Sequence, residues 1–168
     1  MSRSPDVCLA DVDDPMLERL LALAIRDASP DEVTPPLGNG TGWSTERIEW
    51  FRAYHRSAAA GLDGPAAEKS WAIVCDGRTA GSVRLKRAAE GTAETGIWLG
   101  RGFRGRGIGT AALGLVLVEA RRAGLSQVEA HTTAGNTGAR RLLTAAGARL
   151  AHGDGGAVSA AVVLPRMP

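Results

Sequence analysis

The segment 101–110, RGFRGRGIGT, places four glycines and three arginines between a strand-like segment and a helix-like one. The first backbone N–H groups of a helix have no partner inside it, and the helix dipole adds positive potential there. Glycine removes the side chains that would keep a ligand away from those N–H groups, and arginine adds charge-assisted hydrogen bonds. We therefore expect a loop that binds a diphosphate.

Other interpretations of the glycines fit less well. A Walker phosphate loop needs lysine followed by serine or threonine, where this sequence has Ile108 and Gly109. The dinucleotide-binding pattern is met by Gly100, Gly102 and Gly105, but no acidic residue ends a strand about twenty residues later. A turn without a ligand would hold three mutually repelling arginines close together. An ATPase, a GTPase and a Rossmann enzyme are therefore disfavoured.

Composition limits the remaining functions. The chain has 168 residues, is 44% hydrophobic, and carries 20 basic against 18 acidic side chains. One domain over residues 1–168 is expected, and the even charge balance predicts no nucleic-acid partner. Cys8 and Cys75 form no metal-ligand pattern, so no metal site is predicted. The sequence shows neither an apolar targeting segment nor a run long enough to span a membrane, which predicts a soluble cytoplasmic protein with no membrane partner.

Apolar periodicity and turn residues predict the elements that hold the loop. We expect a strand at 7–12, helices at 15–28 and 44–61, a hairpin at 70–88 and a strand at 94–100. A helix at 108–123, a strand at 125–133, a helix at 136–147 and a last hairpin follow. Segment 29–43 contains three prolines and three glycines and is expected to form a long ordered loop or lid. This order predicts one α/β sheet domain.

Two blocks of sequence resemble the GCN5-related N-acetyltransferase (GNAT) superfamily. The stretch RGRGIG at 104–109 matches its R/Q-x-x-G-x-G/A signature, and ETGIWLGRGFRGRGIGTAAL and NTGARRLLTAAGA resemble blocks of its ribosomal-protein N-terminal acetyltransferase-like (RimJ/RimL) branch. The resemblance covers about residues 70–150. It implies an α/β fold with a mixed, mostly antiparallel sheet of six to seven strands, about four helices, and a cleft where the fourth and fifth strands splay apart.

The same resemblance implies acetyl-CoA as the cosubstrate, with its pyrophosphate on the glycine-rich loop. The backbone of Trp98 and Leu99 would pair with the pantetheine arm, and a backbone N–H near Leu99 would stabilise the oxyanion of the reaction. Asn136 matches a coenzyme-contacting asparagine and equally suits a helix cap. The full set of coenzyme-binding candidates is Trp98, Leu99, Arg104, Gly105, Arg106, Gly107, Ile108, Gly109, Thr110, Asn136 and Arg140.

Acetyl transfer to nitrogen requires an uncharged amine, because an ammonium has no lone pair to attack the thioester. The site must therefore remove a proton. Glu94, on the strand before the loop, is the first candidate for the catalytic general base, and His131 on the neighbouring strand is the second. Leu143 replaces the tyrosine that serves as general acid in many family members, and Tyr54 is the only tyrosine in the chain.

The first two helices and their loop, here 27–54, select the acceptor in this family. The segment combines carboxylates with aromatic side chains, which suits a small cationic molecule such as an amino sugar or a polyamine. Its loop also resembles acetyltransferases that inactivate aminoglycoside-type antibiotics such as kasugamycin, so antibiotic resistance by modification is the expected role. The candidate acceptor-binding residues are Asp31, Glu32, Trp43, Trp50 and Tyr54.

Three functions are compatible with these features. The first is a small-molecule N-acetyltransferase, the second an enzyme that acetylates the N-terminal amine of a protein or peptide, and the third a non-catalytic acyl-CoA-binding sensor. The sequence does not fix the oligomeric state, and a homodimer is compatible with it.

Overall fold

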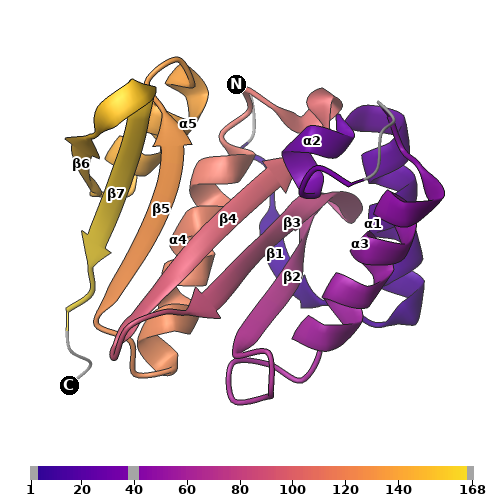
Figure 1. The fold of residues 1–168 in the computed structure, drawn as a ribbon, viewed down its shortest axis with the longest axis horizontal. Helices are drawn as coiled ribbons and strands as arrows, with labels where there is room; N and C mark the ends of the chain where they lie inside the picture. The colour runs from indigo at the N-terminus through magenta and orange to yellow at the C-terminus, as the bar shows by residue number, and fades with distance from the viewer. Residues whose placement is uncertain (1–3, 38–41, 166–168) are drawn as a thin grey trace.

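The computed structural model describes residues 4–37 and 42–165. These residues form one seven-stranded sheet in the order β1-β2-β3-β4-β5-β7-β6, with helices on both faces (Figure 1). The strands are β1 (Val7–Asp11), β2 (Glu68–Cys75), β3 (Arg78–Arg87), β4 (Thr92–Leu99), β5 (Gln127–Thr133), β6 (Arg149–His152) and β7 (Ala157–Val163). The helices are α1 (Asp14–Asp27), α2 (Pro30–Val33), α3 (Thr45–Ala58), α4 (Ile108–Arg122) and α5 (Thr137–Ala145).

The predicted element order and the mixed, mostly antiparallel sheet are confirmed. One element was not expected: α2 begins at Pro30 inside the segment predicted to be a loop, because proline suits the first turn of a helix. Side-chain caps explain the starts of α1 and α3. The Asp13 side chain accepts a hydrogen bond from Met16 N at 2.9 Å before α1, and Ser44 caps α3 in the same way. Within the described residues, no helix is long and apolar enough to cross a membrane.

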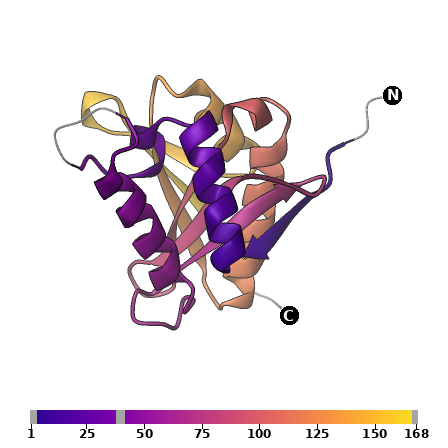
Figure 2. The same ribbon diagram turned by 90° about the vertical axis from the view of Figure 1, so that its right-hand side faces the viewer.

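Two helical layers sandwich the first four strands. Helices α1 and α3 lie side by side on one face, as Figure 2 shows, and α4 packs on the opposite face with α5 beside it. Alternation along β3 divides its side chains between these layers: Val83 and Leu85 are buried in the core under α4, whereas Ser82, Arg84 and Lys86 face the α3 side. The strand therefore supplies core and polar surface from adjacent positions.

The parallel pair β4–β5 is short. Only Thr92, Ala93 and Glu94 of β4 pair with β5, while β4 remains paired with β3 as far as Leu99. Beyond Glu94 the two strands diverge, as Figure 1 shows, and β5 continues its pairing with β7 instead. This divergence confirms the predicted splay and leaves one edge of β4 open in the middle of the sheet.

Helix α3 is bound to the sheet through a buried histidine. His55 is 2% exposed, its Nδ1 lies 2.8 Å from Ser70 Oγ on β2, and its ring packs on Phe51. Because burial penalises the charged imidazolium, the pKa of His55 falls from 6.5 to about 4. The ring is therefore neutral at neutral pH and acts as an uncharged hydrogen-bonding core residue.

This histidine predicts an acid-sensitive fold. Between pH 6.5 and pH 4 the unfolded chain binds a proton at His55 that the folded chain excludes, so its contribution is complete above pH 6.5 and is lost as the pH falls. Between pH 7 and pH 5 the loss amounts to about 2 kcal/mol. Urea unfolding should show a steeper pH dependence for the natural chain than for His55→Asn, which keeps a polar partner for Ser70 without titrating. Equal slopes would contradict this assignment.

Candidate active site

The glycine-rich loop connects β4 to α4 and has the geometry of an anion site. Gly105 and Gly107 have φ angles of +73° and +78°, in the left-handed region that favours glycine. Gly107 immediately precedes α4 and supplies no side-chain cap, so the first N–H groups of the helix face outward without a capping side chain. The start of α4 therefore offers backbone N–H groups of the kind that anion sites use.

Gly109 serves a different purpose from the other two loop glycines. A Cβ built on Gly109 would lie 2.6 Å from Leu142 Cδ1 of α5. The missing side chain therefore lets α4 and α5 pack closely, whereas at Gly105 and Gly107 the space around an added Cβ is open and only the backbone angle demands glycine.

The Arg104 side chain turns back into the protein. Its Nε and Nη2 donate to the Leu99 carbonyl at 3.1 and 3.0 Å, and Nη2 also forms an ion pair with Glu32 of α2. This guanidinium thus joins the loop, the end of β4 and α2. Arg106 remains exposed, with its guanidinium carbon 5.9 Å from the centre of the Phe103 ring.

Two further coenzyme candidates lie at the start of α5. Asn136 Oδ1 accepts a hydrogen bond from Ala139 N at 3.0 Å, so the cap that its sequence position suggested is present. Arg140 Nη1 donates to the Ala134 carbonyl at 2.8 Å. Both side chains therefore stabilise the turn between β5 and α5.

The open edge of β4 presents peptide groups that pair with no strand toward the diverging β5, and one of them, the Leu99 carbonyl, accepts hydrogen bonds from Arg104. Gly100 N donates to the Ala80 carbonyl, and in an antiparallel ladder every second residue points to the same neighbour. Trp98 is in phase with Gly100 and pairs with β3, so Ile97 and Leu99 direct their peptide groups toward β5. The open edge is therefore formed by Ile97 and Leu99, where the sequence suggested Trp98 and Leu99. Amide groups of an extended ligand can pair with this edge.

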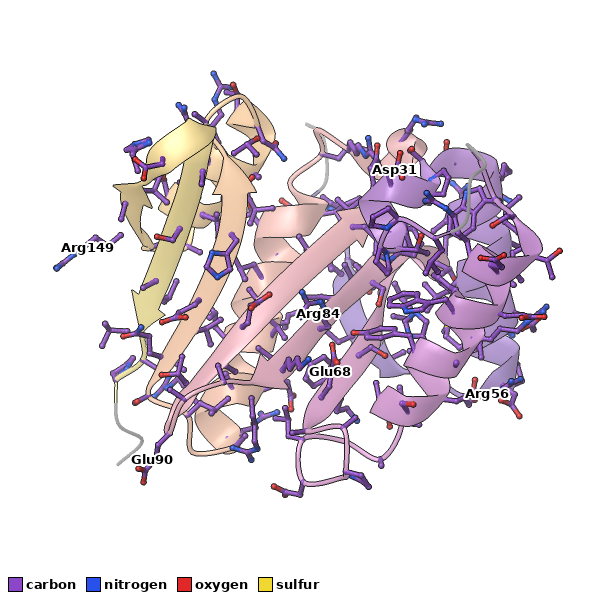
Figure 3. The ribbon with its side chains drawn as sticks, in the orientation of Figure 1. Asp31, Arg56, Glu68, Arg84, Glu90 and Arg149 are labelled. Atoms are coloured by element: carbon purple, nitrogen blue, oxygen red, sulfur yellow. The ribbon has the colours of Figure 1, made fainter. Side chains whose placement is uncertain are left out.

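A cavity lies between α2, α3 and the polar face of β2–β4. It consists of two hollows, of about 330 and 460 Å³, that share Pro35, Trp50, Tyr54 and Arg84 in their walls. We call them together the α3 cavity. The first hollow extends to Trp98 near the open edge, and the second extends past Glu94 to the far end of β3. Figure 3 shows Arg84 and Glu68 on the strands beneath this region.

Three of the five predicted acceptor residues line the α3 cavity: Glu32, Trp50 and Tyr54. The other two do not line it. Asp31 points outward, 75% exposed, and pairs with the buried Arg47 at 2.9 Å. Trp43 packs against Phe51, and its Nε1 donates to the Ala28 carbonyl. These two residues fasten the α2 segment to the helices α1 and α3 and so shape the cavity from outside.

The two candidate bases have different surroundings. Glu94 lines the second hollow at the position where β4 stops pairing with β5. His131 lies two residues beyond Glu129, the partner of Glu94 on β5, and is exposed outside both hollows. Glu94 is therefore the candidate that the fold brings to the cavity.

A chain of polar contacts that sequence reasoning missed runs beneath the cavity. Tyr54 donates to Glu68 Oε2 at 2.7 Å, Glu68 lies 3.7 Å from Arg84 Nη1, and Arg84 Nη2 contacts Glu94 Oε1 at 3.2 Å. Arg84 lies over Gly96, where an added Cβ would be 2.9 Å from its Nε. In the sequence, the only sign of this contact chain is a charged residue between Val83 and Leu85. The strand register that places Arg84 over Gly96 is not visible in the sequence.

Tyr54 is held in its neutral form. Burial, reinforced by the hydrogen bond to Glu68, raises the pKa of its hydroxyl well above the ordinary value of 10. The hydroxyl therefore donates a hydrogen bond and does not supply a phenolate. Within residues 4–37 and 42–165, no three His, Cys, Asp or Glu side chains gather in a way that could hold a metal ion.

Comparison with known proteins agrees with this geometry. The RimL ribosomal L7/L12 alpha-N-protein acetyltransferase in complex with coenzyme A has a TM-score of 0.74 and 17% identity, over 94% of each chain. Mycobacterium smegmatis RimJ in complex with a CoA disulfide has a TM-score of 0.75 and 22% identity, over 94% of this chain and 81% of RimJ. The microcin C7 self-immunity acetyltransferase MccE in complex with acetyl-CoA and AMP has a TM-score of 0.70 and 18% identity, over 94% and 92%.

These likenesses establish the fold, while no curated protein matches the chain in sequence. The family follows from a direct match: the profile described as the acetyltransferase (GNAT) domain aligns with residues 20–149. The glycine-rich loop, the splayed strands and this match together show that the chain belongs to the GNAT family of acetyl-CoA-dependent N-acetyltransferases.

Proposed function

We propose that this enzyme acetylates a primary amine that enters the α3 cavity, with Glu94 as the general base. The observation that carries the proposal is the position of Glu94, whose carboxylate lines the cavity where β4 separates from β5. A thioester laid along the open edge of β4 would meet an amine held in the cavity at this strand. Residues 104–110 would hold the coenzyme pyrophosphate, with Asn136 and Arg140 at the neighbouring turn.

The reaction follows from these positions. Glu94 takes a proton from the ammonium, directly or through a water molecule, and the freed lone pair forms a bond to the thioester carbon. The Leu99 N–H, on the open edge, would stabilise the oxyanion. The carbon–sulfur bond then breaks, the nitrogen gives its extra proton to solvent water as the amide forms, and the CoA thiolate takes a proton from the solvent. Arg84 holds the Glu94 carboxylate in place through the 3.2 Å contact.

The acceptor that we propose is the N-terminal amine of a peptide or protein. The cavity walls carry three carboxylates, at Glu32, Glu68 and Glu94, and three cations, at Arg84, Lys86 and Arg87. Each carboxylate already contacts a positive group of the protein. A polycationic aminoglycoside would therefore meet little unbalanced negative charge. The similarity in fold to RimL, a ribosomal L7/L12 alpha-N-protein acetyltransferase, and to RimJ further supports a protein acceptor.

An amino sugar is the second candidate, because of one observation. The rings of Trp50 and Tyr54 stack at 5.2 Å between centres, 7° from parallel, and both line the cavity. A flat aromatic wall of this kind suits a sugar ring as well as a peptide side chain.

A panel of acceptors separates these functions. With acetyl-CoA, release of free thiol should occur with short peptides that have a free N-terminus and should be absent with the same peptides blocked at that amine. Kasugamycin, kanamycin and spermidine should give little or no thiol. Preferential use of the antibiotics would instead establish the amino-sugar function, and acetyl-CoA binding without thiol release from any amine would identify a sensor.

Replacement of Glu94 tests the proposed base. Glu94→Gln should lower kcat by roughly 10²- to 10⁴-fold at neutral pH, because glutamine cannot accept the proton, and should leave the Kd for CoA unchanged. Glu90→Gln, an exposed position on the turn between β3 and β4 (Figure 3), is the matched control and should keep full activity. If Glu94→Gln turns over normally, the base lies elsewhere, and His131 is the next residue to replace.

A carboxylate in the glycine-rich loop tests coenzyme binding. Gly107→Glu should abolish CoA binding in calorimetry, because its side chain would repel the pyrophosphate at the helix start. Gly124→Glu is matched for backbone strain, with a φ of +82° and open space around the added Cβ, but lies at the other end of α4. It should bind CoA normally. Normal CoA affinity of Gly107→Glu would rule out this loop as the coenzyme site.

A further inference from the structure

The outer end of the α3 cavity is lined by more cations than carboxylates. The second hollow is lined by Arg84, Lys86 and Arg87 against only two carboxylates, Glu68 and Glu94. Arg87 also pairs with Asp63, which lies outside the lining, so the hollow and its partners together are balanced in charge. The ion-pair partners of each cation decide which of the three is available to bind a ligand.

Two of the three cations are occupied by partners within the protein. Arg84 contacts both Glu68 and Glu94, at 3.7 and 3.2 Å. Arg87 donates to the Leu62 carbonyl and pairs with Asp63, both at 3.1 Å. Their guanidinium groups thus have fixed positions and fixed counter-charges.

Lys86 differs from both arginines. It is exposed, lines the second hollow, and makes no ion pair within residues 4–37 and 42–165. Its Cα partner across the ladder is Glu94 on β4. Side chains that face each other across two strands lie about 5 Å apart at their Cβ atoms. The Lys86 ammonium is therefore a neighbour of the proposed base on the side away from the open edge.

We infer that the acceptor carries a carboxylate one or two residues from its reactive amine, and that Lys86 binds this carboxylate. This inference rests on the proposed function and narrows its substrate class to peptides with an acidic N-terminal sequence. An amine held at Glu94 leaves the remainder of the acceptor in the second hollow, where Lys86 is the lining cation that forms no ion pair among the described residues. Opposite charges that face each other there select acidic acceptors over basic ones.

Three tetrapeptide amides test the inference. Each begins with serine, and the next two residues are both glutamate in the first peptide, both glutamine in the second and both lysine in the third. Binding to the enzyme–CoA complex is measured by calorimetry and turnover by thiol release. The glutamate peptide should bind roughly fivefold more tightly than the glutamine peptide, the range of one exposed ion pair, and the advantage should decrease with added salt. A glutamine peptide with a free terminal carboxylate distinguishes a main-chain carboxylate from a side-chain one.

Charge reversal at Lys86 tests whether this residue recognises the acceptor carboxylate. Lys86→Glu should invert the preference, so that the lysine peptide binds more tightly than the glutamate peptide, while CoA affinity stays within twofold. Lys86→Gln should bring the glutamate and glutamine peptides to about equal affinity. Arg149→Glu makes the same change of net charge on β6 at the opposite edge of the sheet (Figure 3) and should leave the preference as it is.

The outcomes separate the inference from the function on which it rests. Equal binding of the acidic and neutral peptides to the natural enzyme, or an unchanged preference in Lys86→Glu, would overturn the inference even if all peptides were acetylated. Absence of thiol release from every peptide would instead overturn the proposed function. The calorimetric ranking would still test whether the cavity selects acidic ligands.

Discussion

The site depends on the point at which β4 and β5 part. Three residue pairs join these strands, and after Glu94 each strand follows a different neighbour. A sheet interior normally satisfies every peptide group with another strand, so an interior edge left open invites a ligand of extended shape. The same divergence lets the loop after β4 place the start of α4 beside that edge. The open strand edge and the glycine-rich loop, the two features proposed to bind the coenzyme, thus have one geometric origin.

The acceptor side is built on a different principle, a polar layer held between a helix and a sheet. Arg84 fits beneath the cavity because Gly96 leaves room for its guanidinium. The same guanidinium contacts both Glu68 and Glu94. Removing only one member of such a group would leave an unbalanced, partly buried charge, which is costly.

Local pattern was sufficient for the elements and for the coenzyme loop. Periodicity, caps and glycines operate over a few residues, so the helices, the strands and the position of the glycine-rich loop were accessible from sequence, whereas the left-handed angles at Gly105 and Gly107 were not predicted. Contacts between distant segments could not be predicted from the sequence. Asp31 and Trp43 had suitable chemistry for a cavity wall, yet pair with Arg47 and Phe51 because of how α2 packs. Strand register, which unites Arg84 with Gly96, likewise depends on tertiary structure.

The position of Arg104 has a thermodynamic consequence. Its guanidinium belongs to the coenzyme loop but is bound to Glu32, a residue of the acceptor wall, and to the carbonyl at the end of β4. A ligand at one site that strengthens or weakens this ion pair changes the binding free energy of the ligand at the other site. Thermodynamic linkage requires this effect to be equal in both directions. A half-exposed pair transmits only a modest coupling. If the proposed sites hold their ligands, coenzyme and acceptor affinities depend on this one shared contact as well as on two separate pockets.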